Sequence, residues 1–173
     1  MAGTTLGGND PQTMYETFRK NGAFPEEFLP FENIKTFQEY YSPKPLPDRL
    51  VEEAKKYLYQ YQFWHEWVEK PGKVIPHQTL KNVLMHSPIA IGTHSWVKDL
   101  NGLYTKAGEE NHWTVLVAFE GDLPVVFDSY EDENNTIKVL EPEYEIRYAK
   151  RIYVEAVQSS ESWIVSILKR LFS

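Results

Sequence analysis

Apolar residues recur every three or four positions in three segments of the first half of the chain. This spacing predicts short amphipathic helices over 11–21, about 49–60 and 77–86. The first opens at a proline and ends at Asn-Gly, the second follows Asp48 as its N-cap, and the third ends before Pro88. The apolar side of each helix must therefore pack against another part of the fold.

The second half of the chain carries short apolar runs that are typical of β-strands. These runs occupy 89–93, 113–119, 123–128, 137–140 and 147–154, about five strands in all. A tight turn at 120–122 joins the second and third of them as a hairpin. Upstream, 23–47 is rich in proline and is predicted to be irregular, whereas the aromatic-rich stretch 59–68 fits either a continued helix or a strand. Helices followed by antiparallel strands make the predicted fold class α+β.

A chain of 173 residues is long enough for one domain, which we expect to span 1–157. The remaining segment, 158–173, places Trp163, Ile167 and Leu171 on one stripe with Lys and Arg opposite. It is predicted to be a C-terminal amphipathic helix that packs on its own domain or on a second subunit. Its few cations argue against a membrane surface as its partner.

The composition excludes several classes of function. Lys and Arg number 18 against 25 Asp and Glu, and the net charge of −7 argues against a nucleic-acid partner. The chain has no cysteine, so it cannot itself supply a disulfide, a Cys-ligated metal site or a thiol nucleophile. It shows no secretory signal peptide and no apolar run long enough to span a membrane. We therefore expect a cytoplasmic protein or a component of a larger particle.

The histidines and serines give few candidates for other chemistry. The five histidines lack the spacing of a His-Glu-x-x-His site, so neither a metal nor a cofactor is predicted. Ser87, Ser95 and Ser129 all lie outside a Gly-x-Ser-x-Gly elbow, which disfavours a serine nucleophile.

One pair of residues stands out by its arrangement. His112 opens the apolar strand 113–119 and Asp128 ends the return strand 123–128, so the hairpin brings an imidazole and a carboxylate together at one edge of the sheet. An Asp in this position fixes the tautomer of the imidazole and stabilises its protonated form, while the His acts as a general base. On geometry alone, a structural hydrogen bond at a strand end is favoured over a catalytic pair.

Several short motifs occur in a fixed order along the chain. Gly7-Gly8 precedes a helix that ends at Asn21-Gly22, and Asn101-Gly102-Leu103-Tyr104 follows in the second half. Next come Asn111-His112-Trp113 and Asp128-Ser129-Tyr130. In this order and spacing the motifs resemble the C-terminal portion of papain-like cysteine peptidases, over about residues 5–155. The pattern is similar to papain-like proteins encoded by bacteria and their phages.

The resemblance implies a role for each matching residue. His112 would be the general base, Asp128 would replace the family's orienting Asn, and Tyr130 would replace its shielding Trp. Gly7 and Gly8 would form the loop that binds the substrate backbone. The implied fold is a papain-like half-barrel of about five antiparallel strands that lacks the family's central helix. That helix carries the nucleophilic Cys, with an oxyanion-hole Gln shortly before it, so this chain alone is not expected to cleave peptides.

Three functions are compatible with these features. The first is a catalytically silent papain-like homologue that acts as a binding or structural component. The second is the base-bearing portion of a true thiol peptidase whose Cys and Gln come from another chain or an upstream segment. The third is an unrelated small α+β interaction domain in which the motifs coincide by chance. Lack of the central helix would expose an apolar face near Met14 and Phe18, where we expect a protein or peptide partner or a second copy.

Overall fold

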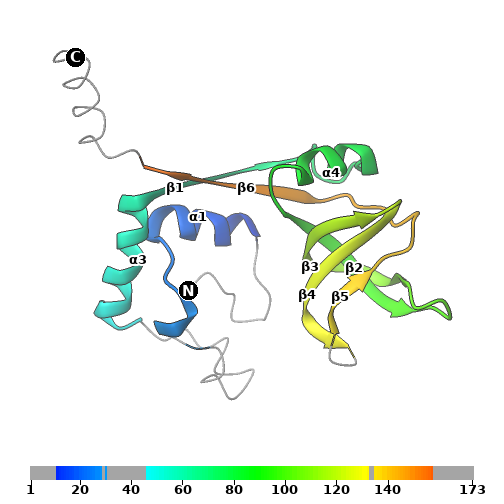
Figure 1. The fold of residues 1–173 in the computed structure, drawn as a ribbon, viewed down its shortest axis with the longest axis horizontal. Coiled ribbons are helices and arrows are strands. Elements are labelled where there is room, and N and C mark those ends of the chain that lie inside the picture. The colour runs from blue at the N-terminus through cyan, green and yellow to red at the C-terminus, as the bar shows by residue number, and fades with distance from the viewer. Residues whose placement is uncertain (1–10, 29, 31–45, 133–134, 158–173) are drawn as a thin grey trace, which may run out of the picture. The chain divides into compact units, whose positions relative to one another are not determined.

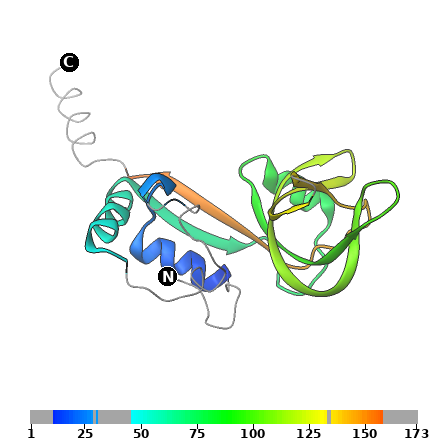
Figure 2. The same cartoon turned by 90° about the horizontal axis from the view of Figure 1, so that it is seen from below.

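The structure, a computed structural model, describes residues 11–28, 30, 46–132 and 135–157. The chain forms two compact units, shown in Figures 1 and 2. The first unit comprises the chain up to Trp64 and from Tyr153 onward, and the second comprises His65–Ile152. The predicted C-terminal helix over 158–173 lies outside the described residues.

The first unit contains two of the predicted helices. Helix α1 spans Pro11–Asn21 and helix α3 spans Asp48–Gln60, with a short 3-10 helix η1 at Glu26–Phe28 between them. The predicted extents of both long helices are confirmed. The assignment of Asp48 as N-cap is wrong, because Pro47 occupies that position and no side chain caps the helix. Asp48 is instead in the first turn, where its charge still favours the helix dipole.

Packing of α1 on α3 depends on a glycine. Gly22 follows α1 with a φ of +78°, and its amide donates to the carbonyl of Phe18 at 2.9 Å, which ends the helix as the Asn-Gly signal predicts. A Cβ on Gly22 would lie 1.9 Å from the carbonyl oxygen of Ala54 in α3. Tyr15, Leu50 and Ala54 are buried in this unit. The close approach of the two helices therefore requires a residue without a side chain at position 22.

Within the described residues the sheet has six strands, one more than predicted. The strands are β1 (Tyr61–Trp67), β2 (Ile89–Lys98), β3 (Tyr104–Glu120), β4 (Leu123–Asp132), β5 (Asn135–Val139) and β6 (Ala149–Ala156). Their order is β1-β6-β2-β3-β4-β5, and the pairings from β6 through β5 are antiparallel. The additional strand is the aromatic-rich segment 61–67, whose alternating burial shows the period of a strand. The predicted α+β class is confirmed.

Strands β2, β3 and β4 are longer than their apolar runs. β3 begins at Tyr104 rather than Trp113, because its polar first half pairs with the second half of β2. The turn that joins β3 to β4 lies between Glu120 and Leu123, with Gly121 at a φ of +63°. Figures 1 and 2 show that β3 and β4 curve strongly, and Tyr104 forms a bridge to Leu140 just after β5. The sheet of the second unit thus curls around its buried face.

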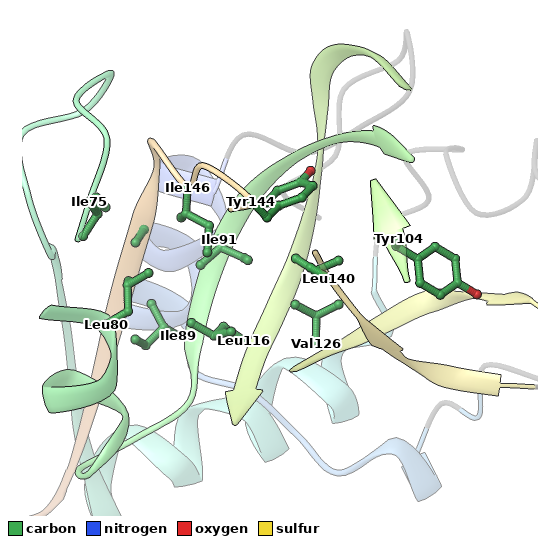
Figure 3. Packing of buried hydrophobic residues seen from close by; sticks show 11 residues of the cluster. Ile75, Leu80, Ile89, Ile91, Tyr104, Leu116, Val126, Leu140, Tyr144 and Ile146 are labelled. Carbon is green, nitrogen blue, oxygen red and sulfur yellow. The ribbon is translucent and has the colours of Figure 1, made fainter. Parts of the chain in front are cut away.

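That buried face holds the hydrophobic core of the second unit (Figure 3). Helix α4 (His77–Leu84) contributes Leu80, and β2 contributes Ile89 and Ile91. The remaining core side chains come from the other strands, from the loop before α4 and from the segment between β5 and β6: Ile75, Tyr104, Leu116, Val126, Leu140, Tyr144, Ile146 and Ala149. In the described part of the chain, no helix is long and apolar enough to cross a membrane.

Candidate functional site

His112 and Asp128 meet on the curved sheet of the second unit. The Nε2 atom of His112 lies 2.7 Å from Oδ1 of Asp128, as the hairpin predicts. The prediction that His112 opens its strand and Asp128 ends its strand, at one edge of the sheet, is wrong, because β3 begins before His112 and β4 continues beyond Asp128. Asp128 is fully buried, whereas the side chain of His112 is 18% exposed. In this pair the carboxylate is in the interior of the fold, and the imidazole is the group that solvent can reach.

The alternation of side chains along β4 and β5 explains why Asp128 is inside. Val126 pairs with Lys138 and Phe127 pairs with Ile137 across these two strands. Because neighbouring side chains on a strand point to opposite faces, Asp128 lies on the same face as Val126. Val126 and Lys138 are both buried, while Phe127 and Ile137 are 47% and 42% exposed. The register thus places a carboxylate and an ammonium on the interior face.

Lys138 and Asp128 form a buried ion pair. The Nζ atom of Lys138 donates to Oδ2 of Asp128 at 2.7 Å, and the two side chains are 2% and 0% exposed. Lysine is almost never buried without a partner of opposite charge, and this carboxylate meets that requirement. Asp128 therefore accepts hydrogen bonds from two cationic or potentially cationic side chains, one through each oxygen. The sequence analysis did not identify Lys138.

Aromatic rings surround this ion pair. The ring of Trp96 in β2 stands edge-on to the imidazole of His112, with centroids 5.7 Å apart and planes at 84°. The ammonium of Lys138 lies 5.5 Å from the centroid of Trp96 and 5.8 Å from that of Tyr104. Both contacts are within the range of a cation–π attraction. Apolar rings therefore limit the access of water to the charged groups.

Bulges in β3 lie opposite the segment of β2 that leads to Trp96. The register between β2 and β3 shifts on both sides of His94, and at each shift the extra residues belong to β3. The backbone amide of His94, between the two shifts, lies outside the regular ladder. That amide donates to the hydroxyl of Tyr144 at 3.0 Å, and Nδ1 of His94 lies 3.0 Å from the carbonyl oxygen of Gly108. Burial raises the pKa of Tyr144 to about 12, so this phenol is neutral at ordinary pH. Tyr144 thus acts as a buried support for this irregular part of the ladder.

β2 and the bulged part of β3 line a pocket of about 380 Å³. Its lining residues are His94, Ser95, Trp96, Asn111 and His112. The hydroxyl of Ser95 donates a hydrogen bond to Oδ1 of Asn111 at 3.3 Å. The pocket therefore combines the imidazole of His112 with the polar side chains of a Ser and an Asn, on walls that also carry an aromatic ring.

The chemistry of Asp128 determines the tautomer of His112. An ionised carboxylate can only accept hydrogen bonds, so the contact with Oδ1 requires a proton on Nε2 of the imidazole. In the neutral ring, Nδ1 is then the nitrogen that carries the lone pair. An imidazole held in this way can take a proton at Nδ1, and Asp128 stabilises the imidazolium that results.

The other predicted site residues lie where the structure gives no side-chain description. Gly7 and Gly8 are outside the described residues, and Tyr130 lies in β4 without a described side chain. The aromatic neighbour that the structure gives to His112 is Trp96. Within the described segments, no three His, Asp or Glu side chains gather in a way that could hold a metal ion.

Comparison with known proteins identifies no relative of this chain. No protein-family model matches the chain, and a search of the curated proteins finds no significant match.

Proposed function

We propose that this chain carries the base-bearing part of a papain-like thiol-peptidase site and is catalytically silent by itself. His112 is the general base and Asp128 is the residue that orients it. The observation that carries the proposal is the 2.7 Å contact between Nε2 of His112 and the buried carboxylate of Asp128, beside a pocket that His112 lines. Silence of the isolated chain follows from the absence of cysteine in its 173 residues.

The proposed reaction needs a thiol and an oxyanion donor from outside this chain. Nδ1 of His112 takes the thiol proton, and the resulting thiolate attacks the carbonyl carbon of a peptide bond. The imidazolium then donates that proton to the leaving amine. In the second half of the reaction, His112 takes a proton from water while the water oxygen attacks the carbonyl carbon of the acyl thioester. The C–S bond then breaks, which releases the acyl group as a carboxylic acid, and the imidazolium returns its proton to the thiolate. Throughout, Asp128 keeps the imidazole in one orientation.

A second candidate is a binding component that never performs catalysis. Its support comes from helix α1, on which Phe18 is 37% exposed and Met14 is half-buried. An apolar face of this kind is suited to a protein or peptide partner or to a second copy. In this alternative the His112–Asp128 pair stabilises the sheet and does no chemistry.

A reconstitution assay separates these two functions. Peptide hydrolysis is measured for the chain alone and after addition of a Cys- and Gln-bearing segment, taken from the adjoining upstream sequence or from a co-purifying chain. We expect no activity from the chain alone and thiol-dependent hydrolysis from the mixture. His112→Ala should reduce that hydrolysis by at least about 100-fold, because it removes the base.

His86→Ala is the control, because it also removes a histidine side chain but His86 is exposed and does not line this pocket. It should retain most of the reconstituted activity. Hydrolysis that survives His112→Ala would contradict the proposal. A folded mixture that is silent in every combination would leave the binding component as the function of this chain.

A further inference from the structure

We infer that Lys138 is a positioning residue that neutralises Asp128 and thereby sets the proton affinity of His112. This inference rests on the proposed base role of His112. Its geometric basis is the three-residue arrangement in which one carboxylate receives Nε2 of His112 at 2.7 Å and Nζ of Lys138 at 2.7 Å.

The substitution of Asp for the family's Asn has an electrostatic consequence. An amide oxygen and a carboxylate oxygen can both accept the Nε2 hydrogen bond, but the carboxylate adds a negative charge. In a buried setting such a charge raises the proton affinity of a neighbouring imidazole. A base that holds its proton too strongly can no longer release it to a leaving group near neutral pH.

Lys138 offsets this increase in the proton affinity of His112. The Asp128–Lys138 ion pair is buried and carries no net charge, so toward His112 it resembles the neutral amide of an Asn. The geometry of a carboxylate acceptor is kept, while the ammonium opposes protonation of the ring. Trp96 and Tyr104 contact the same ammonium, which keeps it beside the carboxylate and away from water.

Other titratable groups near His112 come from two strands. On β2, His94 lines the same pocket, and on β3 itself Glu110 pairs in register with His94. Asp128 on β4 and Lys138 on β5 are the groups of the ion pair. Because Lys138 is buried and bonded to the orienting carboxylate, its charge acts on the imidazole with less screening than that of a surface cation.

The test is an NMR titration of the His112 ring in the isolated chain, which needs no nucleophile. Lys138→Met should raise the pKa of His112 by roughly one unit or more relative to wild type, about a tenfold gain in proton affinity. Lys138→Arg, which keeps the charge, should titrate close to wild type. A purely structural lysine would give no such difference between the Met and Arg variants.

A double variant keeps the test decisive if Lys138→Met does not fold. Asp128→Asn combined with Lys138→Met leaves no charge at the buried pair, so His112 should titrate close to wild type if the wild-type carboxylate is already neutralised by Lys138. A pKa of His112 well below that of wild type would overturn the inference, because it would show that the wild-type carboxylate keeps its full effect on the imidazole. This outcome would not affect the reconstitution assay, which depends on His112 itself, so the two proposals fail separately.

Discussion

At the level of single residues, the sequence predicts the contact of His112 with Asp128 but not the ion pair behind it. The contact follows from hairpin geometry, since the turn at Gly121 sets which residues of β3 and β4 can meet. Lys138 stands between Ile137 and Val139, so hydropathy alone would turn the two apolar residues inward. The strand is turned the other way, with Ile137 exposed and Lys138 buried. Only the neighbouring carboxylate, known from the fold, explains this orientation.

Tyr144 gives a pH-dependent prediction at the same level. Burial raises its pKa to about 12, partly offset by the hydrogen bond from the amide of His94, whereas an unfolded chain has a Tyr pKa of about 10. Between these values the unfolded state loses the proton that the folded state retains. The free energy of unfolding should therefore fall as the pH rises from about 10 to 12, by up to about 3 kcal/mol.

The measurement is denaturant unfolding across this pH range, with Tyr144→Phe as the control. The Phe variant has no phenol to titrate, so its loss of stability over the range should be smaller than that of wild type. Tyr15 in the first unit has a pKa raised to about 12 by burial as well, and it contributes equally to both proteins. Identical losses in wild type and variant would contradict the role of Tyr144 as a buried neutral phenol.

At the level of elements, the sequence predicts where apolar segments lie and misses polar extensions. The helices α1, α3 and α4 follow from apolar spacing together with proline and glycine signals. The first half of β3 was missed because its residues are polar and its pairing with β2 needs no apolar run. The bulges of β3 opposite His94 were missed for a related reason. They accompany a hydrogen bond from the amide of His94 to the hydroxyl of Tyr144, which is distant in sequence.

Gly22 provides a prediction about the packing of elements. Gly22→Ala should destabilise the first unit, because the methyl group would meet the carbonyl oxygen of Ala54 and the backbone has a φ of +78°. Gly121→Ala is the matched control, since Gly121 also has a positive φ but open space around its Cβ position. The control should cost about 1–2 kcal/mol and Gly22→Ala clearly more, as measured by urea unfolding. Equal losses would show that α1 and α3 do not pack this closely.

At the level of the whole molecule, the α+β class follows from the order of helices and strands. The number of strands does not follow from the sequence, because the aromatic-rich segment 61–67 fits both the helical and the strand pattern until its burial is known. The proposed function depends on a group that these 173 residues do not contain. In that proposal His112 and Asp128 are the base and its orienting acid, whereas the sequence has no cysteine that could supply the thiol.

The most direct test of this view is the thiol pKa of the Cys-bearing segment used for reconstitution. It is obtained from the pH dependence of thiol alkylation, for the segment alone and in complex with the wild-type chain or with His112→Ala. We predict a pKa far below the ordinary value of about 8.5 in the wild-type complex, because the imidazolium of His112 stabilises the thiolate, and a return toward that value with His112→Ala. The same thiol pKa in both complexes would contradict the assignment of His112 as the base of a thiol-peptidase site.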